Sequence, residues 1–438
     1  MRNVKAAVCT KCGTEFEAGE ETCACAMCGG ILEIVLDYDH IGARVSREKF
    51  SASKDFSMWR YIDFLPVEEG ARIGPLRAGW SPLYKTGALG EKIGLKNLYV
   101  KDDGLNPTSS LKDRASAIAA VRAFHAGKDT VACSSTGNAA SSLAGAAASM
   151  GLKSVIFVPE RAPQGKLTQL LIFGATVVSV RGNYEAAFRL SAQAIEKYGW
   201  YNRNAAINPY LSEGKKTVSM EIAEQLGFEA PDFAAVSVGD GCTIAGVWKG
   251  FKDLHAAGLI DKLPRLVSVQ AEGCCPVNRA FERSAKDGYA PIEPMEENSL
   301  ADSIAVGVPR NGEKALAAIR ESKGITVNVS DDEILAAMRL LGESAGVFAE
   351  PAGAAGTAGL VKAAALGLIP PDALVVSIVT GNGLKDVVSA QKAAGIGGAA
   401  PENENASNLI RIAPDMDLLA VELAKRGIYE NGRQTGRQ

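Results

Sequence analysis

The strongest constraint on the fold is a regular alternation of two kinds of segment from residue 97 onward. Short β-branched or apolar runs have the length and composition of strands, and the alanine- and leucine-rich segments between them favour helices. Strands that alternate with helices predict parallel sheets covered by helices on both faces. We expect strands at 97–101, 130–134, 154–158, 176–180, 233–238, 265–270 and 373–379. We expect helices at 138–150, 164–173, 184–197, 213–226 and 244–257.

This alternation has room for two parallel sheets, so the predicted fold is α/β, with two interleaved parallel-sheet subdomains and the ligand between them. Ligands of such folds bind at the carboxyl ends of the strands. We expect three parts in the chain: a small N-terminal segment at 1–50, the main body at 51–400 and a peripheral C-terminal helix or tail at 401–438.

Composition limits the classes of function. Apolar residues make up 47% of the 438 residues, which supplies a large core, and the net charge of −3 offers no general attraction to nucleic acid. The sequence has no apolar run long enough to span a bilayer and no signal peptide, so we expect a cytoplasmic protein without membrane partners. With only three histidines, acid–base chemistry falls to lysine, carboxylates or a cofactor.

Four cysteines form the pattern Cys9-x2-Cys12-x12-Cys25-x2-Cys28. Two Cys-x2-Cys knuckles suit tetrahedral zinc, and four thiolates leave no open position, so the ion would be structural in a zinc-ribbon-like segment. A pair of disulfides is the alternative, although a cytosolic protein keeps its thiols reduced. Cys23 is a second candidate for the place of Cys25.

The stretch 106–114, NPTSSLKDR, is predicted to deliver one lysine to the first turn of a helix. Asn106 precedes a proline and marks a turn, and Asp113 suits the positive end of the helix. Because a cation is unfavourable at that end, Lys112 is more easily found neutral, as a nucleophile or base must be. The alternative is an ordinary solvated lysine. The side chains expected to cap this helix are Thr108, Ser109 or Ser110.

Three more turns of small polar residues each follow a strand and open a helix: 134–138 (SSTGN), 239–243 (GDGCT) and 380–386 (TGNGLKD). The second is typical of a phosphate-binding turn, since small residues let backbone amides approach an anion. It is not a dinucleotide fingerprint, because Ile244 stands where the third glycine would be, and the chain has no Walker motif. A lysine, a phosphate-binding turn and polar side chains are what pyridoxal phosphate requires.

With these motifs the chain resembles the threonine synthases, which are pyridoxal-phosphate enzymes of the tryptophan-synthase-β-like class, or fold type II. Their signature N-P-T-G-S-F-K-D-R resembles NPTSSLKDR here, and the resemblance covers about residues 9 to 390, from the cysteine knuckles through W-R-Y, W-S-P-L, F-A-E-P-A-G-A-A and T-G-N-G-L-K-D. It implies that Lys112 forms the Schiff base, that Asn138 binds the pyridoxal 3′-oxygen and that Thr380 faces the ring nitrogen. The residues implied to hold the phosphate are Gly239, Asp240, Gly241, Cys242 and Thr243. Those implied to contact the substrate are Ser110, Arg114, Ser135 and Thr136.

The resemblance implies a lyase that converts O-phosphohomoserine and water to L-threonine and phosphate. The expected partners are a small-molecule amino-acid substrate and a second copy of the chain. The chain differs from the family in the residues expected to bind the substrate's phosphate. Leu211 replaces the arginine of N-P-x-R-x-E-G-x-K-T, and Ala205 and Ala206 replace small polar residues. The cations that could compensate are Arg203, Lys215, Lys216 and Arg114.

Two alternatives follow from this departure. One is a β-elimination or β-replacement enzyme, such as a serine or threonine dehydratase or a cysteate-synthase-like enzyme, acting on a different side chain. The other is a non-catalytic scaffold with a decayed site. The presence of Lys112, Asn138 and Thr380 at their expected places argues against decay.

Overall fold

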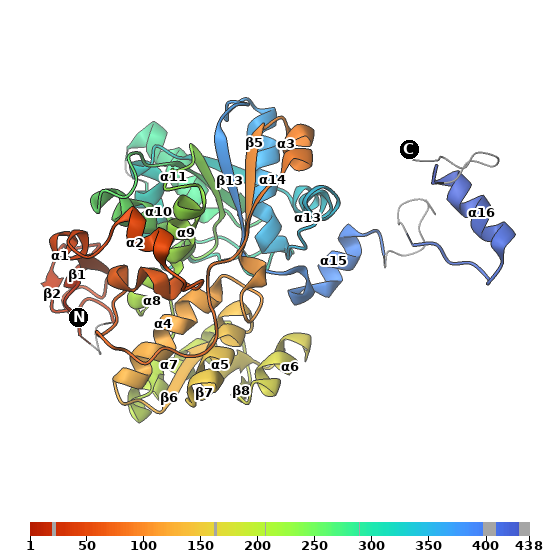
Figure 1. Cartoon of the computed structure of the whole chain (residues 1–438). Coiled ribbons are helices and arrows are strands. Elements are labelled where there is room, and N and C mark those ends of the chain that lie inside the picture. Colours follow the sequence, from red (N-terminus) through yellow and green to blue (C-terminus); the bar gives the residue numbers. More distant parts are fainter. Residues whose placement is uncertain (20–22, 162–163, 206, 289, 397–408, 429–438) are drawn as a thin grey trace.

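The chain folds into three β-sheets surrounded by helices, and the two larger sheets are mainly parallel (Figure 1). The predicted α/β fold is confirmed, and all seven predicted strands are present. None of the helices described is both long and apolar enough to cross a membrane. The structure is a computed structural model that describes residues 1–19, 23–161, 164–205, 207–288, 290–396 and 409–428.

The larger sheet has six strands, and only the pairing of β4 with β5 is antiparallel. Its central strand β10 is buried along its whole length, as expected where helices cover both faces. In spatial order the strands are β12 (Ile325–Val329), β11 (Arg265–Ala271), β10 (Phe233–Ser237), β13 (Leu374–Val379), β5 (Asn97–Asp102) and β4 (Leu83–Lys85). The helices around it are α3 (Gly87–Ile93), α10 (Cys242–Ala256), α11 (Pro276–Asp287), α12 (Gly312–Glu321), α13 (Asp331–Ala345), α14 (Pro351–Ala365) and α15 (Val387–Ala393).

The smaller sheet has four parallel strands, β8 (Thr176–Val180), β7 (Lys153–Pro159), β6 (Thr130–Ser134) and β9 (Tyr201–Asn202). The helices that contact it are α4 (Lys112–His125), α5 (Asn138–Met150), α6 (Gln164–Ile172) and α7 (Tyr184–Tyr198). The single helix predicted at 213–226 is in fact two, α8 (Tyr210–Lys215) and α9 (Thr217–Gln225).

Helix α4 connects the two sheets, because it leaves β5 of the larger one and leads into β6 of the smaller one. Its residues Ile118 and Val121 pack into one apolar cluster, while its alanines Ala115, Ala119 and Ala123 pack into another, with α5 and β6. Lys112, the first residue of α4, therefore lies where the two subdomains meet.

The N-terminal segment forms an antiparallel sheet of β2 (Glu15–Phe16), β1 (Val4–Cys9) and β3 (Leu32–Leu36). Three short helices follow it, α1 (Tyr38–Gly42), α2 (Arg47–Ala52) and the 3-10 helix η1 (Met58–Phe64). This sheet shares an apolar cluster with η1 and α10, so it packs directly on the main body. At the other end, α16 (Met416–Lys425) has no buried residue and stands apart from the sheets in Figure 1.

A buried network of charges ties α4 to the larger sheet. Arg114 of α4 binds Asp103 through two hydrogen bonds of 2.7 and 2.8 Å and also contacts Glu221 of α9. Lys101 of β5 binds Glu221 at 2.7 Å. Two cations and two carboxylates balance each other, and the side chains of all four are fully buried. Although burial raises the pKa of Glu221, Arg114 and Lys101 hold it down to about 2.

We predict that Glu221→Gln lowers the free energy of unfolding by about 3–5 kcal/mol, because it leaves two buried cations, Arg114 and Lys101, with the Asp103 carboxylate as the one anion of the network. The folded pKa of about 2 lies below the value of about 4.3 for an unfolded glutamate, so this stabilisation is complete above that value and is lost as the pH falls toward 2. Thermal unfolding of both proteins between pH 7 and mildly acidic pH measures the difference.

The control is Asp372→Asn, which removes the exposed ion pair with Lys96 and is expected to change the unfolding temperature little. An equal effect of the two substitutions, or a gap that widens as the pH falls, would contradict the assignment of Glu221 as an ionised structural partner.

Candidate active site

Two of the predicted turns are joined by backbone hydrogen bonds. They follow β5 and β13, which are neighbouring parallel strands of the larger sheet. Leu111 N donates to Thr380 O at 2.9 Å, and Asn382 N donates to Ser109 O at 3.1 Å. Ser110 and Gly381 form an isolated β-bridge between these bonds. The turn that carries Lys112 is thus held by the turn after β13.

The prediction that Thr108, Ser109 or Ser110 caps α4 is wrong. The N-cap is Leu111, and it forms no side-chain capping bond. Asp113 instead folds back and accepts hydrogen bonds from Thr108 N at 2.8 Å and from Thr108 Oγ1 at 2.7 Å. Ser109 adopts a left-handed conformation, φ +68°, at the place where the resembling signature has glycine. The turn is therefore closed by a carboxylate from inside the helix.

The Lys112 amine lies in a half-buried and electropositive place. Loss of water around the ammonium lowers the pKa of Lys112 to about 8, and the nearby cation Lys215 acts in the same direction. Arg203 adds to this effect, whereas Cys242 and Glu350 oppose it. A substantial fraction of the amine is therefore neutral near pH 8, as a nucleophile or base requires.

Asn138 is the first residue of α5, at the carboxyl end of β6. Its Nδ2 donates to Glu350 Oε1 at 2.7 Å, and both side chains are buried. Glu350 N in turn donates to Gly381 O at 3.0 Å. These bonds connect the turns after β6 and β13 across the two subdomains. Glu350 was not predicted as a site residue, although an acidic residue before the proline that opens α14 is a signal in the sequence.

The turn 239–243 has the geometry of an anion-binding turn. Gly241 has φ +96°, and a Cβ there would lie 2.5 Å from Asn311 O, so this position requires glycine. The turn opens the 15-residue helix α10, whose first amides have no intrahelical acceptor. The Asp240 carboxylate accepts hydrogen bonds from Arg310 N at 2.8 Å and Asn311 Nδ2 at 2.7 Å, so Asp240 holds the neighbouring loop.

The other predicted site residues lie in the same turns. Ser110 is fully buried, and its Oγ has no hydrogen-bond partner among the residues that the structure describes. Ser135, Thr136 and Thr380 are half-buried, and Ser135 Oγ accepts from Gly137 N at 3.2 Å. An amine of lowered pKa, a glycine turn at a helix start and a buried hydroxyl without a partner fit a ligand with an aldehyde and a phosphate.

The four cations that could bind the phosphate of a substrate differ in their partners within the structure. All the guanidinium nitrogens of Arg114 donate within the buried network, so we assign Arg114 to the fold rather than to the substrate. Lys216 Nζ binds Glu213 and Asp253 at 2.6 Å each. Arg203 and Lys215 have no ion pair of this kind in the described part of the chain. Leu211 is fully buried in the apolar cluster beside α4.

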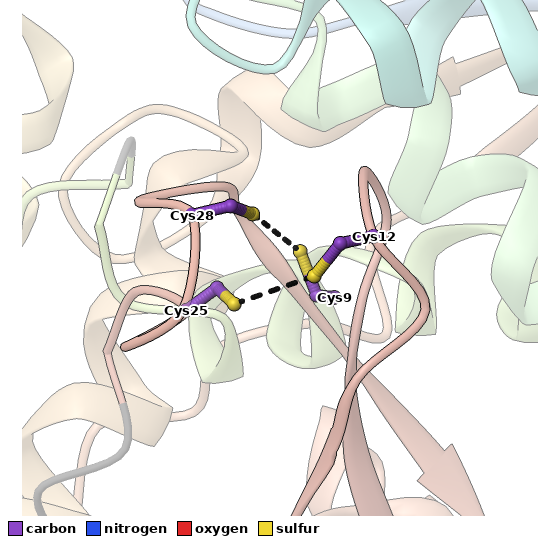
Figure 2. A group of neighbouring side chains, drawn as sticks. All are labelled: Cys9, Cys12, Cys25 and Cys28. Carbon is purple, nitrogen blue, oxygen red and sulfur yellow. Dashed lines mark hydrogen bonds between the residues drawn. The ribbon is translucent and has the colours of Figure 1, made fainter.

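The four predicted zinc ligands converge on one point between the two knuckles (Figure 2). Their sulfur atoms all lie within 4.8 Å of one another, with Cys9 and Cys28 at 3.5 Å and Cys12 and Cys25 at 3.7 Å. A tetrahedral zinc ion with Zn–S bonds of about 2.3 Å would separate its sulfurs by about 3.8 Å. The group contains Cys25 and not Cys23, and none of these cysteines forms a disulfide.

Comparisons with known proteins show the family to which the chain belongs. The family model described as pyridoxal-phosphate dependent enzyme matches residues 75–381. The threonine synthase of Methanocaldococcus jannaschii is 41% identical over 386 residues, which are 88% of this chain and 94% of that protein. The threonine synthase of Methanosarcina acetivorans is 42% identical over 380 residues, 86% of this chain and 91% of that protein.

Solved structures show the same fold at lower identity. Threonine deaminase isoform 2 from Solanum lycopersicum has a TM-score of 0.60 and 22% identity, covering 73% of this chain and 88% of that one. Serine racemase from Dictyostelium discoideum has a TM-score of 0.58 and 25% identity, covering 69% of this chain and 92% of that one. From the family match, the identity to curated relatives and the lysine turn between two parallel sheets, we conclude that this chain belongs to the threonine synthase family of pyridoxal-phosphate dependent enzymes.

Proposed function

We propose that the chain converts O-phosphohomoserine and water to L-threonine and phosphate, with pyridoxal phosphate attached to Lys112. The observation that carries this proposal is the position of the Lys112 amine, whose pKa is lowered to about 8 where the turns of both sheets meet. Relatives named threonine synthase, which match most of the chain, support the choice of substrate.

In this proposal each turn has a separate task. The amides of Gly239, Gly241, Cys242 and Thr243 would hold the cofactor's phosphate, and Asp240 would hold their loop in place. Asn138, oriented by Glu350, would bind the 3′-oxygen of the ring, and the neutral Thr380 would face its nitrogen. The side chains offered to the amino-acid substrate are Ser110, Ser135 and Thr136.

Pyridoxal phosphate, when bound, acts as an electron sink that stabilises negative charge at the substrate's Cα. The protein's part is to position the substrate and to carry protons. When it is not bonded to the cofactor, Lys112 Nζ would take the proton from Cα, because a pKa of about 8 for the free amine leaves part of it neutral at the working pH. The same nitrogen can later return a proton to the substrate.

The second candidate function is β-elimination or β-replacement on a substrate with a smaller, uncharged side chain. Leu211 favours it, because this residue is apolar and buried where the resembling family has arginine. A leucine makes no charge-assisted hydrogen bond to a phosphate dianion.

We predict that the purified holoenzyme releases inorganic phosphate from O-phosphohomoserine with a higher kcat/KM than it forms keto acids from serine or threonine. A panel of the three substrates, with separate phosphate, ammonia and keto-acid assays, measures this. Formation of pyruvate or 2-oxobutanoate without phosphate release would assign the chain to the second candidate function instead.

We predict that Lys112→Ala abolishes turnover and the absorbance band of the lysine-bound cofactor without changing the fold, since its amine is the proposed point of attachment. Borohydride reduction of the wild type, followed by peptide mass spectrometry, should place the reduced cofactor on Lys112. The control is Lys385→Ala, which removes a lysine from the turn after β13 and should leave Lys112 labelled. A reduced cofactor on another lysine of the wild type would reject the assignment.

We also propose that Cys9, Cys12, Cys25 and Cys28 bind one structural zinc ion. The convergence of four thiols, at sulfur distances close to those of a tetrahedral site, supports this ion. Four sulfur ligands leave no open position for a substrate, so its role would be to stabilise the N-terminal segment.

We predict about one zinc ion per chain in protein purified under reducing conditions, because all four ligands are already close together. A strong chelator should unfold the N-terminal segment before the catalytic body, as hydrogen exchange of β1 to β3 would show. Cys25→Ala should lose the ion, whereas the matched variant Cys23→Ala should keep it. If Cys25→Ala retains zinc and Cys23→Ala loses it, the fourth ligand is Cys23 and the assignment of Cys25 is wrong.

We propose the cytoplasm as the location of the protein. A zinc site of four thiolates, as proposed above, requires reduced cysteines, which supports a reducing compartment such as the cytoplasm. The expected homodimer stays a prediction, to be measured by light scattering of the holoenzyme.

A further inference from the structure

Buried cations in proteins are normally paired, and most of those in this chain are. Those that bind carboxylates are Arg60, Lys101, Arg114, Lys216 and Lys249. Arg122 and Lys314 donate to backbone carbonyl oxygens instead. Within the described residues, Arg203 and Lys215 are the buried cations whose side chains bind neither a carboxylate nor a backbone carbonyl oxygen.

Arg203 follows β9 and is 2% exposed. Its Nε donates to Ser116 Oγ at 3.0 Å, while its Nη2 is buried without any hydrogen-bond partner in the described chain. Asp113 lies within electrostatic range, but its carboxylate accepts from Thr108 and not from Arg203. A guanidinium N–H left buried and unpaired costs free energy, so a ligand oxygen is the partner that this geometry lacks.

Lys215 ends α8 and is 0% exposed. Its Nζ donates to Cys242 Sγ, and sulfur is a weak acceptor that leaves the other two N–H donors available. Cys242 opens α10, so this ammonium lies beside the free amides at the start of that helix. Lys215 also lies one turn after Leu211 on the same face of α8.

Arg203 and Lys215 come from different elements, yet both lie close enough to Lys112 to act on its amine, and Cys242 is a common neighbour of the two. The carboxylate that also acts on Lys112 is Glu350, which already accepts from Asn138. Arg203 and Lys215 therefore bring positive charge to the Lys112 side of the site, while the carboxylate that acts there, Glu350, is already hydrogen-bonded to Asn138.

We propose that Arg203 and Lys215 together bind a phosphate dianion inside the active site. A phosphate would accept from the unpaired Nη2 of Arg203 and from the remaining donors of Lys215 through charge-assisted hydrogen bonds. Two sources share this chemistry: the phosphate of the substrate, which rests on the proposed function, and the 5′-phosphate of the cofactor.

The test compares Arg203→Gln and Lys215→Gln with Arg122→Gln, each as the full-length holoenzyme. Arg122 is a matched control, because it is a buried arginine of α4 that donates to backbone carbonyls away from the site. The measurements are kcat/KM for O-phosphohomoserine, inhibition by inorganic phosphate, the affinity for pyridoxal phosphate and the thermal shift produced by inorganic phosphate.

If the substrate's phosphate is bound, each site variant should lose about 10- to 100-fold in kcat/KM and in inhibition by inorganic phosphate, with cofactor affinity unchanged. If the cofactor's phosphate is bound, the affinity for pyridoxal phosphate should fall by about the same factor, and saturating cofactor should restore the rate. Arg122→Gln should match the wild type in all these measurements.

Failure of the proposed function can be recognised separately. A wild type that releases no phosphate from O-phosphohomoserine rejects that function, while the cofactor affinity and the thermal shift with inorganic phosphate still test the anion site. The anion site itself is overturned if both site variants keep wild-type cofactor affinity and wild-type response to inorganic phosphate.

Discussion

The candidate active site depends on the backbone hydrogen bonds between the turns that follow β5 and β13. Leu111 N to Thr380 O and Asn382 N to Ser109 O join these turns, and parallel pairing of the two strands brings them to the same edge of the sheet. These bonds involve main-chain atoms, and the Asp113 carboxylate closes the same turn by accepting from Thr108, so Lys112 is positioned without a side-chain bond from the N-cap residue. The subdomain of the smaller sheet is connected to this site through Asn138 and Glu350. Their hydrogen bonds link the start of α5 to the turn after β13.

Buried charges in this chain have two different roles. The network of Lys101, Asp103, Arg114 and Glu221 is balanced within itself, and it fixes α4 against β5 and α9. Arg203 and Lys215 are not balanced in this way, although they are just as deeply buried. In a folded protein such an imbalance has a free-energy cost that an anionic ligand can remove. The difference lies in the partners of each cation, not in residue type or burial.

The sequence predicted most of the fold because strand and helix patterns alternate so regularly. The strand at Ile325–Val329 was missed, since its polar residues Thr326 and Asn328 interrupt the apolar run at the edge of the sheet. All four predicted turns do lie between a strand and a helical element, as their sequence patterns indicated. What could not be predicted was which of the candidate cations are paired with carboxylates inside the fold. Arg114 is two residues after the signature lysine, yet its partner Glu221 lies 107 residues further along the chain.

The central claim is that these turns hold pyridoxal phosphate on Lys112, and a crystal structure of the holoenzyme tests it most directly. We expect continuous electron density from Lys112 Nζ to the cofactor, with the phosphate at the start of α10 and Asn138 beside the ring. Attachment to a different lysine, or a phosphate bound away from the amides of residues 239–243, would contradict the account.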